Sequence, residues 1–131
     1  MFFTRVFWVA SVLLFTGGLA GCSEKDDQHA KQAARWLKDT SGLYPLPYGW
    51  QYGTVTPLGS DGVEMDVHIA NEEQEKNVRS MPQMKRFAAV QPACPKKDAE
   101  IWTFLNDTQK VWVNLIGTNG ERLTRGSCWQ K

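Results

Sequence analysis

Apolar residues recur along this chain with more than one period, and each period predicts a different element. Residues 6–15 form an uncharged apolar run, shorter than the roughly 20 residues that span a bilayer. Residues 28–39 have the 3.6-residue period of an amphipathic helix, with Gly42 as its stop. The apolar positions of this helix share one face: Ala30, Ala33, Ala34 and Leu37.

The next segment predicts a loop followed by two strands. Residues 43–50 (LYPLPYGW) combine prolines with aromatic residues, which predicts extended backbone. Such a segment is either a loop packed on the protein's own core or a ligand for another domain. Residues 48–56 predict a first strand and residues 57–62 a turn. Residues 63–69 predict the clearest strand, in which Val63, Met65, Val67 and Ile69 alternate with Glu64, Asp66 and His68.

A second helical region begins at Asn71, which has Gln74 at the N3 position of a capping box. Pro82 must kink or split this helix, because proline has no N–H to donate. The methionines near that proline either pack in the core or form an adaptable binding groove. Four apolar residues at three-residue spacing are predicted to share this side: Val78, Met81, Met84 and Phe87.

The last third of the chain predicts a short helix and a hairpin. Residues 97–106 suit a short buried helix, although the same apolar cluster could start a strand. Residues 110–118 and 121–129 flank Asn119-Gly120, the dipeptide favoured in type I′ turns. A two-residue loop would pair Ile116 with Leu123, Asn114 with Arg125, and Val111 with Cys128.

The order of these elements predicts the fold class. Helices and strands are mixed rather than strictly alternating, which is typical of α+β proteins. We therefore expect a small antiparallel sheet of about four strands with two to four helices packed on it.

The start of the chain has the three parts of a secretion signal. Arg5 charges the first part, residues 6–15 form the apolar part, and small residues follow. The signal closes on a sequence that resembles the lipobox of bacterial lipoproteins at all four positions: Leu19, Ala20, Gly21 and Cys22.

This resemblance implies that residues 1–21 are removed and that Cys22 carries acyl chains, which tether the protein without spanning the membrane. Ser23 then implies the outer membrane, because an aspartate at that position in lipoproteins favours retention at the inner membrane. Residues 22–28 are polar and are predicted to be a lipidated tether. Residues 29–131 are predicted to form one domain.

Lipidation of Cys22 leaves Cys94 and Cys128 as an even pair in an oxidising compartment, which indicates one disulfide. A closed loop of roughly 35 residues would stabilise the fold by about 3 to 4 kcal/mol. The alternative is a redox or metal-binding role. It is disfavoured because the sequence has no Cys-x-x-Cys spacing and no histidine near Cys94.

Charge and motifs narrow the function classes. Removal of Arg5 with the signal leaves 14 basic and 14 acidic residues and no basic block, which argues against nucleic-acid binding. The two histidines, His29 and His68, belong to no metal-binding or catalytic motif, and no nucleophile elbow is present. We predict that the protein is not an enzyme and needs no metal or cofactor.

The folded part resembles the β-type pilotins of type II secretion systems. The resemblance rests on Ala93-Cys94-Pro95, on Ile101-Trp102, and on the closing hairpin from Val111-Trp112-Val113-Asn114 to Ser127-Cys128. Pilotins bind a C-terminal segment of the secretin and carry it to the outer membrane. The resemblance implies a groove that captures a partner helix or strand.

The predicted function is an outer-membrane-anchored, non-catalytic binding or assembly module with a protein partner in the cell envelope, a secretin subunit being the suspected one. The alternatives are a periplasmic inhibitor of a lysozyme-like enzyme and a structural accessory of an envelope or conjugation complex. Exposed tryptophans and methionines are typical interface anchors. The residues predicted to bind the partner are Trp102, Trp112, Met81 and Met84.

Overall fold

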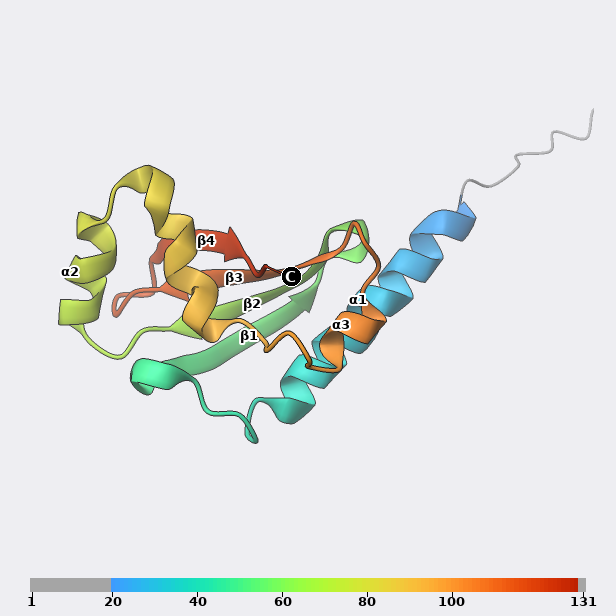
Figure 1. Ribbon diagram of the computed structural model, residues 1–131, viewed down its shortest axis with the longest axis horizontal. Helices are drawn as coiled ribbons and strands as arrows, with labels where there is room; N and C mark the ends of the chain where they lie inside the picture. Colours follow the sequence, from blue (N-terminus) through green and yellow to red (C-terminus); the bar gives the residue numbers. More distant parts are fainter. Residues whose placement is uncertain (1–19, 130–131) are drawn as a thin grey trace, which may run out of the picture.

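The computed structural model describes residues 20–129 of the chain, and the side chains from residue 24 onward. It has the predicted α+β fold (Figure 1). Most of the predicted secretion signal lies outside the described residues. The elements are α1 (Ala20–Thr40), η1 (Pro47–Gly49), β1 (Gln51–Pro57), η2 (Gly59–Asp61), β2 (Gly62–His68), α2 (Glu72–Ser80), η3 (Gln83–Ala93), α3 (Ile101–Phe104), β3 (Lys110–Ile116) and β4 (Arg122–Ser127), where η denotes a 3-10 helix.

The four strands form one sheet in the order β1-β2-β3-β4. The outer pairs are antiparallel, but β2 and β3 run parallel, with Val63 opposite Val111 and Val67 opposite Leu115. The prediction of an entirely antiparallel sheet is therefore wrong at the central pair. The reason is the crossover: residues 69–109 leave the end of β2, pass through α2, η3 and α3, and return to the end where β2 began (Figure 1).

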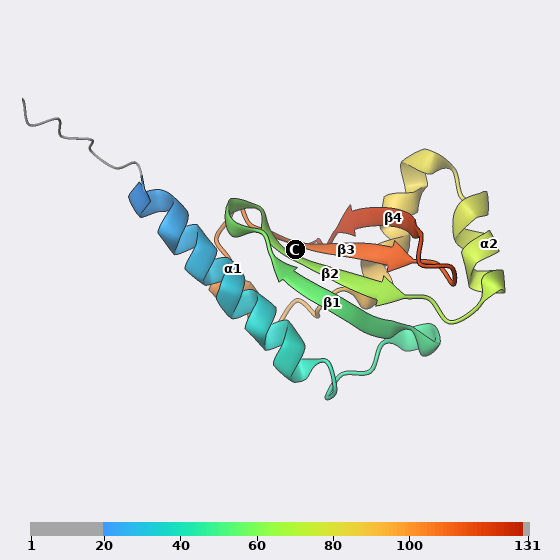
Figure 2. The same ribbon diagram turned by 180° about the vertical axis from the view of Figure 1, so that it is seen from behind.

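One face of the sheet carries the core. The inward residues of β2 and β3 are fully buried, as the alternation in residues 63–69 predicted. Val63, Met65 and Val67 of β2 and Val111 of β3 are each at most 1% exposed. Helix α1 packs at the β1 side of this face and η3 at the β4 side. Seen from behind in Figure 2, η3 lies behind the strands, and the other face of β2, β3 and β4 carries no helix.

Helix α1 begins earlier than predicted. The expected tether of residues 22–28 lies inside this helix, which starts at Ala20. Tertiary contacts explain the difference: the Asp26 carboxylate accepts a hydrogen bond from Asn106 Nδ2 at 2.7 Å, and its main-chain carbonyl accepts one from Gln109 Nε2 at 2.8 Å. Polar composition suggested a solvated linker, but these polar groups have partners from distant parts of the chain.

The helix predicted after Asn71 is confirmed, and so is its interruption at Pro82. The Asn71 side chain accepts a hydrogen bond from the Gln74 main-chain N–H at 3.0 Å. The Gln74 side chain, however, accepts from the main-chain N–H of Ala70 at 2.9 Å rather than from that of Asn71. Helix α2 ends at Ser80, and a 3-10 helix with a different periodicity follows.

This change of helix type breaks the predicted apolar side. Val78 is buried at 7% exposure, whereas Met84 is 86% exposed and Phe87 is 44% exposed. The prediction of one shared side for these residues is therefore wrong, because a three-residue spacing was counted through a point where the helix axis changes.

The hairpin is confirmed with a different loop. Asn114 lies opposite Arg125, and the Cys128 N–H donates to the Val111 carbonyl at 2.8 Å, as predicted. Ile116 lies opposite Arg122 rather than Leu123, because the register shifts after Leu115. The loop has three residues and ends with Gly120 at φ 83°, the left-handed conformation of a G1 bulge.

The remaining local predictions hold with shifted boundaries. The first strand begins at Gln51 rather than residue 48, since Tyr48 in η1 has a φ of 63°. Residues 97–106 contain a helix, as predicted, but only over Ile101–Phe104. The predicted disulfide is present: Cys94 and Cys128 are joined, with their Cα atoms 5.5 Å apart.

Candidate functional site: a cleft beside α1

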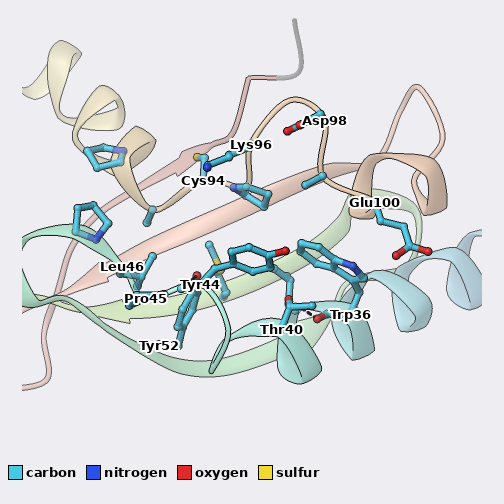
Figure 3. Close-up of a pocket in the computed structure, with 17 residues that line it drawn as sticks. Trp36, Thr40, Tyr44, Pro45, Leu46, Tyr52, Cys94, Lys96, Asp98 and Glu100 are labelled. Atoms are coloured by element: carbon cyan, nitrogen blue, oxygen red, sulfur yellow. Dashed lines mark hydrogen bonds between the residues drawn. The ribbon is translucent and has the colours of Figure 1, made fainter.

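A cleft of about 630 Å³ opens between α1, the proline-aromatic loop and the segment of residues 92–100. Its volume lies in the range typical of ligand sites. Figure 3 shows Trp36 and Thr40 on α1 and Tyr52 on β1, across from Cys94, Lys96 and Asp98. The lining includes three large aromatic side chains and four prolines: Trp36, Tyr44, Tyr52, Pro45, Pro47, Pro92 and Pro95.

The α1 wall owes its position to the amphipathic pattern of the helix. The alanine face packs against the sheet, with Ala33 at 0% and Ala34 at 3% exposure. Their small side chains let the helix approach the strands closely. Trp36 and Thr40 then lie at the margin of this face and border the cleft. The Thr40 hydroxyl donates to the Trp36 carbonyl at 2.7 Å and so is already satisfied within the helix.

The proline-aromatic loop forms a second wall. Its position depends on a hydrogen bond from the Tyr52 hydroxyl to the Tyr44 carbonyl at 3.1 Å. Burial raises the pKa of Tyr52, so this phenol keeps its proton and goes on donating to a higher pH than a solvated tyrosine would. The side chain of Tyr44 remains 58% exposed. The loop therefore packs on its own domain, one of the two predicted roles, and still offers an aromatic surface.

The third wall is the segment of residues 92–100, which follows η3. The disulfide from Cys94 to Cys128 joins it to the end of β4. The Trp102 indole N–H donates to the Lys96 carbonyl at 2.7 Å, and the Ala99 N–H donates to the same carbonyl at 3.0 Å. These contacts hold a stretch without regular secondary structure.

The floor and rim of the cleft differ in polarity. Met65 of β2 lies at the floor and is only 1% exposed. Lys96, Asp98 and Glu100 are exposed at the rim. The ion pairs of the described residues involve only Arg79 and Arg125, so these three rim charges are unpaired within residues 24–129. The cleft combines an apolar interior with charges that a partner can reach.

The residues predicted to bind a partner are not brought together. Trp102 is 8% exposed and belongs to the core, so the prediction that it is a surface anchor is wrong. Its ring packs in the core, since α3 lies against α1 and Trp102 belongs to the buried cluster. Met84 is the most exposed of the four, while Met81 is partly buried where α2 ends. Neither methionine lines the cleft.

Trp112 lies on the face of the sheet that carries no helix. The Arg125 guanidinium lies 4.3 Å from its ring centroid and also pairs with Glu64 at 3.0 Å. Beside it, Asn114 Nδ2 donates to the Asp66 carboxylate at 2.9 Å. These groups link neighbouring strands through an ion pair and an aromatic contact. They are partly buried, since Asn114 is 4% exposed, and its Oδ1 and Arg125 Nε have no hydrogen-bond partner within residues 24–129.

The histidines lie apart from the cleft. His68 is exposed at the end of β2, as predicted for the polar face. His29 is in the middle of α1, where its ring contacts the Phe104 carbonyl. No group of three acidic, histidine or cysteine side chains within the described part of the chain is arranged to hold a metal ion.

Sequence reasoning missed the three aromatic residues of the cleft. Trp36 lay within the predicted helix but was not among the residues assigned to its apolar face, and Tyr44 and Tyr52 belonged to separate predicted elements. The sequence feature that pointed toward the cleft was the proline-aromatic composition of residues 43–50. Composition alone, however, does not show that this loop lies opposite residues 92–100.

Comparison with known proteins finds no matching family, no similar curated protein and no similar solved structure. None of the helices in residues 20–129 has the length and apolarity needed to cross a bilayer.

Proposed function

We propose that this chain is an outer-membrane lipoprotein that captures a helical segment of an envelope protein in the cleft beside α1. The cleft carries the proposal, because aromatic and proline side chains border it and it is open to solvent at Tyr44. Aromatic side chains in such positions dominate protein interfaces. The lipid on Cys22 would supply the membrane address, and a secretin subunit is the suspected partner.

The lining favours a helix over an added strand. A partner strand would need free main-chain donors along an extended edge. Four of the lining residues are prolines, which have no N–H: Pro45, Pro47, Pro92 and Pro95. A partner helix needs only side-chain contacts, because its own main-chain groups are paired internally. Apolar anchors of such a helix would contact Trp36, Tyr44 and Tyr52.

Purification of the lipidated protein from outer membranes tests this function. The wild-type protein should retain one envelope protein, and Cys22→Ser should lose it because the chain no longer reaches that membrane. Tyr44→Ala should weaken retention while leaving localisation intact. Tyr48→Ala is the matched control, since Tyr48 is exposed to a similar extent (65% against 58%) but does not line the cleft.

Equal retention by Tyr44→Ala and wild type would contradict the cleft as the binding surface. Recovery of no partner from any membrane fraction would contradict the assembly role itself.

A further inference from the structure

We infer that the segment captured in the cleft carries a basic side chain, arginine or lysine. This side chain would lie at the end of the cleft that is lined by Trp36 and Glu100. This inference rests on the proposed function and adds the chemistry of the partner. The cleft offers two kinds of group that attract a cation, namely aromatic faces and free carboxylates.

The aromatic contribution comes from Trp36, Tyr44 and Tyr52, which line the same cleft from α1, the loop and β1. The face of an aromatic ring is electron-rich and attracts an ammonium or guanidinium group within about 6 Å. Tryptophan is the strongest of these rings. In Figure 3 the side chain of Glu100 extends to the same end of the cleft as Trp36.

The ionic contribution comes from Asp98 and Glu100, both exposed and both on the cleft rim. Neither makes an ion pair with another residue of the described chain. The one basic residue of the lining, Lys96, lies beside Cys94, toward the other end of the segment in Figure 3. Among the lining residues, Glu100 is therefore the charged group at the end near Trp36.

The sheet face without helices shows what such a site looks like when it is filled. There, Arg125 lies over the Trp112 ring and pairs with Glu64 at 3.0 Å, so one guanidinium satisfies an aromatic face and a carboxylate together. In the cleft the aromatic face and the carboxylate are present, and none of the described residues supplies the cation. A basic side chain of the partner would complete the arrangement.

Two synthetic helical peptides test the inference. Both carry the same leucine stripe, and they differ at one flanking position, which holds arginine in one and uncharged citrulline in the other. Binding to the full-length lipidated protein in detergent micelles is measured by calorimetry. We expect the arginine peptide to bind on the order of tenfold more tightly, because the cation gains both contacts. The preference should shrink at high salt, where charge interactions are screened.

Glu100→Gln should reduce this preference to about threefold, because the ion pair is lost and the cation–π contact remains. Glu73→Gln is the control, since Glu73 is an exposed carboxylate on α2, outside the cleft. Glu73→Gln should behave as wild type.

The possible failures are distinguishable. Equal binding of both peptides would overturn the basic side chain and leave apolar capture intact. Binding of neither peptide would count against the cleft as a helix site and so against both proposals. If tetramethylammonium competes with the arginine peptide but not with the citrulline peptide, the aromatic contribution is supported. If it does not compete, and Glu100→Gln keeps the full preference for arginine, the placement of the basic side chain near Trp36 and Glu100 is overturned.

Discussion

Two of the three walls of the cleft, α1 and the segment of residues 92–100, reach their positions by different means. Helix α1 is regular over Ala20–Thr40 and buries a continuous face of small and apolar residues. The segment of residues 92–100 begins with the last two residues of the 3-10 helix η3, Pro92 and Ala93, and is irregular after them. Its position depends on the Cys94–Cys128 disulfide and on two hydrogen bonds to the Lys96 carbonyl. The hydrophobic pattern of the local sequence therefore specifies α1, whereas a disulfide and hydrogen bonds to other segments position residues 92–100.

The largest expected effect follows from removing the long-range covalent link. Cys94→Ala with Cys128→Ala should destabilise the domain by about 3 to 4 kcal/mol, because the unfolded chain regains the freedom of a closed loop. Chemical denaturation measures this loss. Hydrogen exchange should show faster opening of residues 83–100 than of α1. Equal loss of protection in both walls would contradict the comparison.

The next effect concerns the close approach of η3 to the sheet. A Cβ atom on Gly126 of β4 would lie 2.5 Å from the Phe87 carbonyl oxygen and 2.8 Å from Val90 Cγ2. Gly126→Ala should therefore push η3 outward and cost about 1 to 3 kcal/mol in the free energy of unfolding.

Gly42→Ala is the control for that substitution, because nothing lies within 4 Å of its Cβ position. Thermal unfolding of both variants checks the difference. A stable Gly126→Ala protein with an unchanged cleft would show that η3 is held more loosely than its contacts suggest.

A smaller effect is expected where the chain leaves the sheet toward η3. Asn71→Ala removes the hydrogen bond that caps α2 and should lower the free energy of unfolding by about 1 kcal/mol. Asn77→Ala within α2 is the matched control, since the Asn77 side chain is exposed. Urea denaturation compares the two. A control variant as unstable as Asn71→Ala would contradict the capping role.

The smallest effect depends on pH and sharpens the role of the proline-aromatic loop. The pKa of Tyr52 in the folded protein is raised above its ordinary value of about 10 by burial. An unfolded chain then loses the phenolic proton first, so this contribution to stability is complete below pH 10 and is lost as pH rises through the raised pKa. Tyr52→Phe should make stability less dependent on pH above 10, as measured by thermal unfolding.

The sequence alone determined the local elements and the pairing of cysteines. Strict alternation located β2, Asn71 located the start of α2, and Pro82 located the break before η3, because each depends on near neighbours in the chain. The hairpin register at Asn114 and Arg125 also followed from the turn dipeptide, although Gly120 formed a bulged loop. The predicted lipidation of Cys22 left Cys94 and Cys128 as partners, and the disulfide is present.

Only the tertiary structure decided the direction of β3, the helical state of residues 24–28 and the cleft. Each depends on where a distant segment returns: the crossover sets the parallel pair, Asn106 and Gln109 hold Asp26, and residues 92–100 face Tyr44. Hydrophobic periodicity specifies which face of an element is buried, but not which element covers it. The charged rim at Glu100 was invisible in sequence for the same reason, since its neighbour Trp36 is brought there by folding.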